Sequence, residues 1–455
     1  MAPSVVRFPP RVLVFVVSAV LVVGACSSAG SPSTSGGAPA PAASQAAASG
    51  ATGSAATGQV GGQVTVWTAW GGNELKAFQA VLKPFTDKTG IQVLATTVRD
   101  FSQLAINVDA GTPLPDIAGP PNPDKIPEWA QKGIMKPLEE ILGADGWAAY
   151  SKDTNPALLT IGVVDGKHYL EMVKTQVKGL QWYNTKVFTG TPPKTYDELL
   201  AIKPPSGAKL TCVGLESGDA SGWPGTDMLA NIVMRQSGPD VYTSWYQGKQ
   251  PWNSPEIKAA YQLFGKFVSE ADVYGGPNTV LSTNFGRAGK PLFADPPGCM
   301  FLEQATFIPS FFLEDYPNLK PKDDFDFFPD PSINSQFDGN IEGFWDSFVA
   351  YNDTPQSRAL MQYMSTAEAQ QIWVDAGGTL AALKTITKYP DPIFAHAAQV
   401  AADAKNILPT AGDQMPADMQ HAFWKSTLDF TNDQSQLDTI LAHLDEVRAA
   451  SYTTQ

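Results

Sequence analysis

Val64-Thr-Val-Trp-Thr68 opens the folded part of this chain as a short run of residues that favour β-structure. In the stretch that follows, 73–89, apolar side chains recur at helical spacing, at Leu75, Phe78, Leu82 and Phe85. Gly90 is a good helix terminator, and Ile91-Gln-Val-Leu94 indicates a second strand directly behind it. The opening segment therefore predicts the start of a βαβ unit.

The next stretch repeats the alternation. A short amphipathic segment at 101–108 predicts a helix, and Pro115-Asp-Ile-Ala-Gly119 predicts a third strand. A βαβαβ order favours an α/β lobe with a mostly parallel sheet. Strand-like segments at 211–215 and 325–328 suggest a second sheet, and Ser365-Thr-Ala-Glu368 fits a capping box that would begin a later helix.

The N-terminus has the pattern of an export signal followed by a tether. Arg7 and Arg11 precede an apolar run that is too short to span a bilayer and ends in small residues before Cys26. We interpret residues 1–25 as a signal peptide, Cys26 as the lipidated cysteine of a lipobox, and 26–62 as a flexible tether, because 27–63 holds no charged or aromatic residue. An ordinary cleaved signal with an unmodified cysteine is the alternative.

Length and charge narrow the class of protein. The body after the tether has about 390 residues, and single cores stop growing at about 250–300 residues, so we expect two lobes. The formal net charge is −14, which argues against nucleic acid as a partner because phosphates need a basic surface. With Cys26 lipidated, Cys212 and Cys299 form an even pair; we predict a disulfide, with two buried thiols as the alternative.

The common enzymatic and metal-binding motifs are absent from the sequence. The four histidines lack metal-ligand spacing, and no CxxC pair, P-loop or G-x-S-x-G motif occurs. We therefore expect no catalytic residues, no metal and no cofactor. Two of the 45 acidic residues meeting in a cleft, as in a secreted glycoside hydrolase, remain an alternative.

Tryptophans and other aromatic residues recur near turns and strand ends. A sugar site uses flat rings for the C–H faces of the ligand and polar groups for its hydroxyl rim. Trp67 and Trp70 close the first strand, and Trp223, Trp345 and Phe423-Trp424 continue the series. For any single tryptophan, packing in the core is the alternative interpretation.

Four stretches of the body resemble the bacterial extracellular solute-binding proteins of family 1, the group of maltose-binding protein. They are Val64–Glu74 with Phe85–Val93, Leu114–Ile117 with Gly133–Leu138, Gly179–Phe188 with Pro192–Leu199, and Gln414–Pro416 with Ala422–Trp424. Within the family, Cys212–Asp227 and Pro297–Phe307 look most like the α-glucoside-type binding proteins.

The resemblance implies a two-lobe α/β fold of the type II periplasmic-binding-protein kind, with the ligand in a cleft between the lobes. The chain would cross between lobes near 174–179 and again near 340–344. Lobe 1 is then expected to comprise 63–176 and 341–385, and lobe 2 to comprise 177–340 and 386–455.

Position by position, the resemblance also implies a set of ligand contacts. Those in lobe 1 and at the crossings are Trp67, Trp70, Glu74, Asn122, Lys178, Trp345 and Asp346; those in lobe 2 are Ser221, Trp223, Glu303, Gln304 and Trp424. At Pro120-Pro121 the sequence departs from the family pattern, which has an aromatic residue there. Tyr183 and Asn184 are better explained as structural residues.

The function that the resemblance implies is capture of a carbohydrate, α-glucoside-like, for an ABC importer. The expected partners are the sugar, the permease subunits and, through the lipid at Cys26, the outer face of the cell membrane; we expect a monomer. Three alternatives stand beside it: a binding protein for a non-sugar solute such as a polyamine, peptide or glycerol phosphate, the glycoside hydrolase, and a lipoprotein that serves a chemoreceptor or a structural role.

Overall fold

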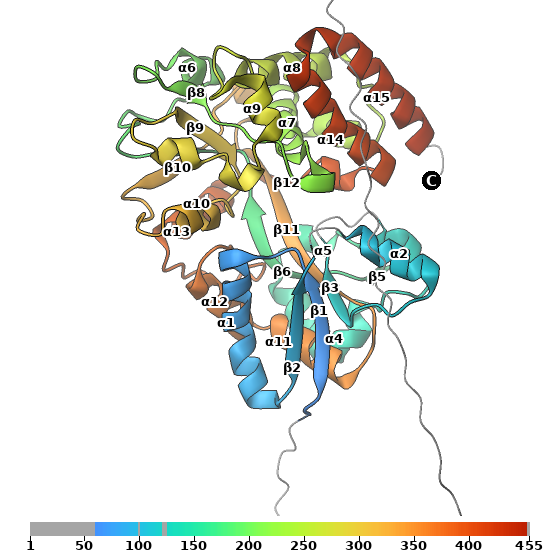
Figure 1. Cartoon of the computed structure of the whole chain (residues 1–455). Helices are drawn as coiled ribbons and strands as arrows, with labels where there is room; N and C mark the ends of the chain where they lie inside the picture. Colours follow the sequence, from blue (N-terminus) through green and yellow to red (C-terminus); the bar gives the residue numbers. More distant parts are fainter. Residues whose placement is uncertain (1–59, 99–100, 121–124, 453–455) are drawn as a thin grey trace, which may run out of the picture. The chain divides into compact units, whose positions relative to one another are not determined.

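In the computed structural model (Figure 1), residues 60–98, 101–120 and 125–452 are described, and they belong to one compact unit, Thr57–Gln455. The predicted signal peptide, Cys26, nearly all of the tether and Asn122 lie outside the described residues. Two lobes are present, each built around its own sheet, so the predicted two-lobe α/β fold is confirmed.

A six-stranded sheet runs through lobe 1 and continues along the crossing strands to β12 (Asn406–Pro409) at the border of lobe 2. The strands, in order where they form one path, are β12, β11 (Asn340–Ala350), β3 (Ile117–Gly119), β1 (Gln63–Thr68) and β2 (Gln92–Thr97), and β6 (Glu171–Val177) also pairs with β11. β1 runs parallel to both β2 and β3, which confirms the predicted βαβαβ order. β12 joins the sheet only at the end of β11 that points towards lobe 2.

Helices pack on both faces of the lobe 1 sheet. They are α1 (Gly72–Thr89), α2 (Ser102–Ala110), α3 (Ile126–Gln131), α4 (Leu138–Asp153), α5 (Pro156–Leu159), α11 (Pro355–Met364) and α12 (Ala367–Ala376), with a small hairpin of β4 (Val163–Val164) and β5 (Lys167–His168) beside them. α1 buries Phe78, Leu82 and Phe85 as its apolar spacing predicts, and it ends where Gly90 adopts a left-handed φ of 71°. None of the helices in the described residues is long and apolar enough to cross a membrane.

Lobe 2 contains a four-stranded sheet in the order β10 (Phe325–Pro329), β7 (Leu180–Asn184), β9 (Cys299–Gln304) and β8 (Lys209–Thr211). Its helices are α6 (Tyr196–Ala201), α7 (Trp223–Tyr246), α8 (Pro255–Phe267), α9 (Gly276–Ser282), α10 (Pro309–Asp315), α13 (Pro392–Asp403), α14 (Ala417–Asn432) and α15 (Leu437–Ser451). A disulfide joins Cys212, just after β8, to Cys299 at the start of β9, with their Cα atoms 5.7 Å apart.

Two antiparallel strands, β6 and β11, run between the lobes (Figure 1). Gly343 pairs with Val177, Phe344 with Gln176 and Trp345 with Thr175. Two local predictions are displaced. The strand expected at 211–215 is β8, which ends at Thr211. Thr366, and not Ser365, is the N-cap of α12, because its side chain accepts the hydrogen bond from the amide of Ala369.

Candidate functional site

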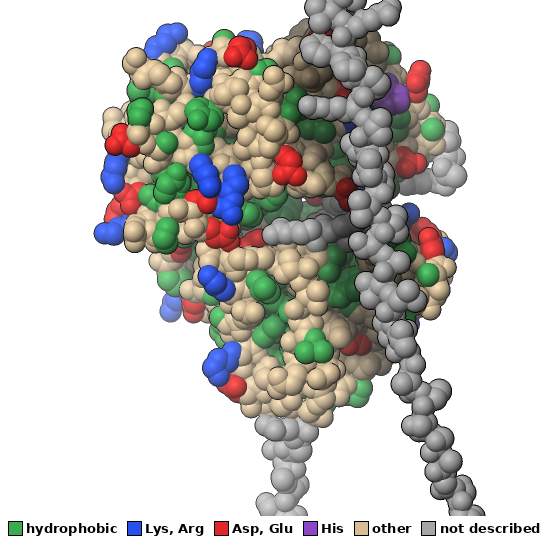
Figure 2. All heavy atoms as spheres, in the orientation of Figure 1, with side chains coloured by type: hydrophobic (Ala, Val, Ile, Leu, Met, Phe, Trp, Pro, Cys, Tyr) green, Lys and Arg blue, Asp and Glu red, His purple; other side chains and the backbone are tan. Residues whose placement is uncertain are grey.

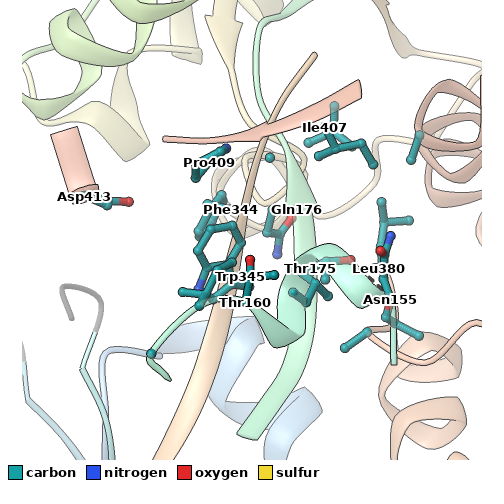
Figure 3. A pocket seen from close by; sticks show the side chains of 18 of the residues that line it. Asn155, Thr160, Thr175, Gln176, Phe344, Trp345, Leu380, Ile407, Pro409 and Asp413 are labelled. Carbon is teal, nitrogen blue, oxygen red and sulfur yellow. Dashed lines mark hydrogen bonds between the residues drawn. The ribbon is translucent and has the colours of Figure 1, made fainter. Parts of the chain in front are cut away.

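A cavity of about 1070 Å³ lies where β6 and β11 cross between the lobes (Figure 3). Its volume is near the upper end of the range for small-molecule sites, roughly 300–1,000 Å³. Phe344 and Trp345 of β11 stand in the middle of the cavity beside Gln176 of β6, while Asp413 and Leu380 lie on opposite sides of the crossing strands.

The cavity wall is mainly apolar, and its aromatic side chains are those of Tyr246, Phe344, Trp345 and Tyr389. Its polar side chains are those of Asn155, Thr160, Thr175, Gln176, Tyr246, Thr387, Tyr389, Gln399 and Gln414, and its charged side chains are those of Lys384 and Asp413. The ammonium of Lys384 donates to the carbonyl of Lys152 at 2.9 Å. An apolar wall with a few polar groups is the composition that small-molecule sites share.

Asp413 is a half-buried residue in the 3-10 turn Gly412–Gln414 of lobe 2. Burial raises the pKa of its carboxyl to about 6, an effect that the nearby ammonium of Lys178 reduces. Its Oδ1 accepts a hydrogen bond from Gln420 at 3.2 Å. The turn thus holds an oriented carboxylate at the wall of the cavity.

A buried lysine in β6 connects three elements of lobe 1. The Nζ of Lys174 lies 3.1 Å from Oε1 of Glu74 in α1 and 3.1 Å from Oδ2 of Asp346 in β11, and it sits 4.7 Å from the ring centre of Trp70. Burial alone would lower the pKa of Lys174, but the carboxylates of Asp346 and Glu74 outweigh it and raise that pKa. Two of the predicted contacts, Glu74 and Asp346, are therefore already engaged in ion pairs within the protein.

Trp70 itself is packed in the core of lobe 1. Its ring makes edge contacts with Phe78, Phe348 and Trp373 at centroid distances of 5.1, 5.6 and 4.8 Å, and only 3% of the residue is exposed. Trp67 is half-buried and packs against a second cluster of lobe 1. In this arrangement Trp70 has the environment of a core residue.

Lys178, the residue that directly follows β6, forms an ion pair with lobe 2. Its Nζ lies 2.8 Å from Oδ2 of Asp227 in α7 and 4.9 Å from the ring centre of Phe344. Burial alone would lower the pKa of Lys178, but the charges led by Asp227 raise it. Lys178, Asp227, Glu303 and Gln304 also line a cavity of about 10 Å³, roughly the space of one water molecule. The structure thus brings three predicted residues, Lys178, Glu303 and Gln304, to one buried spot.

Four carboxyl groups are buried together at the base of lobe 2. Burial raises the pKa of Glu303 and of Glu342 well above the usual range, and Asp330 and Asp227 shift in the same direction for the same reason. The charge of Arg235 offsets this effect at Glu303 and Asp330, and that of Lys178 offsets it at Glu342 and Asp227.

The predicted aromatic contacts of lobe 2 come from two neighbouring helices. Trp223 begins α7, half-buried, with its ring 5.0 Å from that of Phe285. Trp424 of α14 is 8% exposed and packs against the ring of His421 at 5.1 Å. Ser221 is bonded locally, since its hydroxyl donates to the carbonyl of Gly218 at 2.6 Å.

Of the predicted ligand contacts, Trp345 alone is in the wall of the large cavity, and Asn122 lies outside the described residues. Sequence reasoning missed Asp413, Phe344, Gln176 and Thr160. The available signal for Asp413 was its place directly before Gln414-Met-Pro416, one of the stretches that carry the family resemblance. Within the described part of the chain, no three His, Cys, Asp or Glu side chains are grouped to hold a metal ion.

The fold recurs in solved structures of sugar receptors. The solute receptor AcbH, described as having an exclusive preference for β-D-galactopyranose, superposes with a TM-score of 0.73 at 18% identity, covering 86% of this chain and 99% of that one. A chitin oligosaccharide binding protein gives 0.72 at 19% identity, covering 86% and 98%. At these identities the likeness shows the shared fold.

Sequence relatives are closer. The osmoprotective compounds-binding protein GgtB of Synechocystis is 33% identical over 380 residues, which is 81% of this chain and 88% of the relative. The α-glucosides-binding periplasmic protein AglE of Rhizobium meliloti is 30% identical over 396 residues, 83% of this chain and 85% of the relative. A family model described as bacterial extracellular solute-binding protein matches residues 80–410. The chain therefore belongs to the bacterial extracellular solute-binding proteins of ABC transporters, non-enzymatic and extracytoplasmic, and is close to the α-glucoside-type binders.

Proposed function

We propose that this protein captures an uncharged carbohydrate, an α-glucoside-like di- or oligosaccharide, and delivers it to an ABC permease. The observation that carries the proposal is the cavity at the crossing strands, with the rings of Phe344 and Trp345 in its middle (Figure 3). A flat ring can pack against the C–H face of a sugar, while Asp413 offers an acceptor for hydroxyl groups. The relative AglE, an α-glucosides-binding protein by name, supports the same ligand class.

Trp345 and Asp413 are the contacts that we propose first, because both line the cavity. The other sequence-based contacts remain proposals: Trp67, Trp70, Glu74, Asn122, Lys178, Ser221, Trp223, Glu303, Gln304, Asp346 and Trp424. A sugar that touched both lobes would favour the closed arrangement through contacts that the open arrangement lacks. In this proposal lobe 1 comprises 63–176 and 341–385, and lobe 2 comprises 177–340 and 386–455.

We further propose that Cys26 carries a lipid after removal of residues 1–25, that 26–62 tethers the body to the cell membrane, and that the protein acts as a monomer. Mass spectrometry of the membrane fraction would test the anchor. A diacylated N-terminal Cys26 is expected, and a mature protein that starts at another residue would contradict it.

A second candidate ligand is a small osmoprotective compound. It is favoured by the relative GgtB, which at 33% identity over most of the chain is named for binding such compounds. Both candidates are small and hydrophilic, so a shared ligand panel can separate them.

Thermal unfolding of the full-length protein with millimolar maltose, trehalose, sucrose, cellobiose, glycine betaine or spermidine tests the proposal. A ligand at a thousand times its Kd adds about 4 kcal/mol, which raises Tm by several degrees. A sugar should give this shift, Trp345→Ala should remove it, and Trp147→Ala, on α4 beside His168, should keep it. A shift with glycine betaine and none with sugars would favour the osmoprotectant, and a shift with spermidine alone would overturn both candidates.

A further inference from the structure

The start of helix α1 in lobe 1 lies against helix α10 in lobe 2. The backbone N–H of Asn73 donates to Oε1 of Glu314 at 3.2 Å, and the side-chain amide of Asn73 donates to the carbonyl of Ser310 at 3.3 Å. These are contacts between two lobes that the crossing strands β6 and β11 join elsewhere. The described arrangement therefore has the lobes touching at the rim as well as connected at the strands.

The first turn of α1 has no cap of its own. Its N-cap residue is Gly71, and no side chain of that residue can accept a hydrogen bond from the free N–H groups. The carboxylate of Glu314 supplies what is missing: it accepts from one of these N–H groups and places a negative charge at the positive end of the helix. Lobe 2 thus caps a helix of lobe 1.

Lobe 2 holds Glu314 in position for this contact. Phe312 of α10 is buried against Trp182 and Phe325, which fixes the helix to the lobe 2 sheet. NH2 of Arg287 lies 3.7 Å from Oε2 of Glu314, while its NH1 pairs with Asp315. Figure 2 shows basic and acidic side chains gathered over the region of α10.

Gly72 leaves the space that the carboxylate occupies. A Cβ at this position would lie 1.7 Å from Oε1 of Glu314, and the residue has a φ of 52°. An alanine there would force Glu314 away from the helix. Two substitutions on opposite lobes, at Gly72 and at Glu314, therefore disturb the same contact.

We propose that Glu314 and the first turn of α1 form an interlobe latch that holds the two lobes together and determines how long a ligand stays bound. Loss of a cap or of a negative charge at a helix N-terminus should change the equilibrium constant between joined and separated lobes by about three- to tenfold. Because the latch holds the two lobes together, its loss should speed opening of the cleft and so act on dissociation more than on association. The kinetic test of the latch needs the bound sugar, so this test rests on the proposed function.

The kinetic test measures dissociation of the sugar found in the panel, followed by intrinsic tryptophan fluorescence in a stopped-flow instrument. Glu314→Gln and Gly72→Ala should each raise koff about three- to tenfold with little change in kon. Glu446→Gln, a matched change at an exposed position of α15, should leave koff unchanged. Unchanged koff in both latch variants would overturn the latch.

The second test needs no ligand and separates the latch from the proposed function. Hydrogen–deuterium exchange is measured by mass spectrometry on the ligand-free full-length protein and the same variants. Gly72→Ala, a change in lobe 1, should speed amide exchange in α10 of lobe 2, and Glu314→Gln should speed exchange in the first turn of α1. If each substitution affected only its own lobe, the contact would be a local cap and the latch would be wrong; if no sugar bound while the cross-lobe effect was seen, the proposed ligand class alone would fail.

Discussion

Removal of the disulfide in lobe 2 gives a prediction whose size follows from the structure. The bond between Cys212 and Cys299 closes a loop of 87 residues. In the chain-entropy model a loop of this length restricts the unfolded chain by about 4.6 kcal/mol. Both residues are buried among Trp182, Leu302 and their neighbours, so a substitution also loses packing contacts. We therefore expect the double variant Cys212→Ala/Cys299→Ala to lose roughly 4–5 kcal/mol of unfolding free energy, by urea titration.

The single variants sharpen this prediction. Either substitution breaks the same bond, so Cys212→Ala and Cys299→Ala should each cost nearly as much as the double variant, with strongly non-additive effects. Addition of a reductant to the wild-type protein under unfolding conditions should reproduce the loss, since only then are the sulfurs accessible. Additive losses, or a double variant destabilised by less than about 1 kcal/mol, would refute the argument that the bond acts through the unfolded chain.

Three further predictions concern a buried ion pair, a close approach and a raised pKa. Lys174→Met leaves two carboxylates without their buried partner and should cost about 3–5 kcal/mol by urea titration. In Gly222→Ala, a Cβ would lie 2.1 Å from the carbonyl oxygen of Trp424, so Tm should fall by several degrees. Gly111 also has a positive φ but has open space around it, so the Tm of Gly111→Ala should fall by less. Because burial raises the pKa of Asp413 to about 6, the folded chain binds a proton that the unfolded chain releases between about pH 4 and 6, and stability falls as pH rises through that range. Asp413→Asn should therefore be more stable than wild type above pH 6 and lose this advantage below pH 4, by thermal unfolding at each pH.

Each of these has an outcome that contradicts it. A Lys174→Met variant of wild-type stability would show that the two carboxylates are neutralised in another way. Equal losses for Gly222→Ala and Gly111→Ala would assign the whole effect to backbone conformation. If the stability difference between Asp413→Asn and wild type did not vary with pH, Asp413 would not be the group that titrates, because the predicted effect requires a proton bound to its carboxyl in the folded state.

The sequence predicted the elements that depend on local chemistry. The bounds of α1 were predicted to within one residue from the apolar spacing of Phe78, Leu82 and Phe85 and from the terminator Gly90. Helix periodicity and a left-handed C-cap both depend on residues that are close together in the sequence. The start of α12 was misplaced by one residue, since Ser365 and Thr366 are adjacent hydroxyl residues and only the backbone decides which one caps.

The site was less predictable because aromatic residues serve sites and cores alike. Nothing local distinguishes Trp70, which is surrounded by Phe78, Phe348 and Trp373, from Trp345, which stands at the wall of the cavity. Asp413 was missed for a related reason, since the direction of a side chain in a short 3-10 turn depends on how lobe 2 packs.

The two buried lysines favour an uncharged ligand. Lys174 lies in β6, and Lys178 directly follows this strand. Each already has carboxylate partners in the protein, Lys174 with Glu74 and Asp346 and Lys178 with Asp227. An anionic solute would have to compete with these buried ion pairs for Lys174 or Lys178, which leaves Lys384 as the one lysine among the described residues of the cavity wall. The carboxylate of Asp413 in the same wall would repel such a solute. A neutral polyol meets neither obstacle, because its hydroxyl groups can donate to the carboxylate and its C–H faces can pack on the rings.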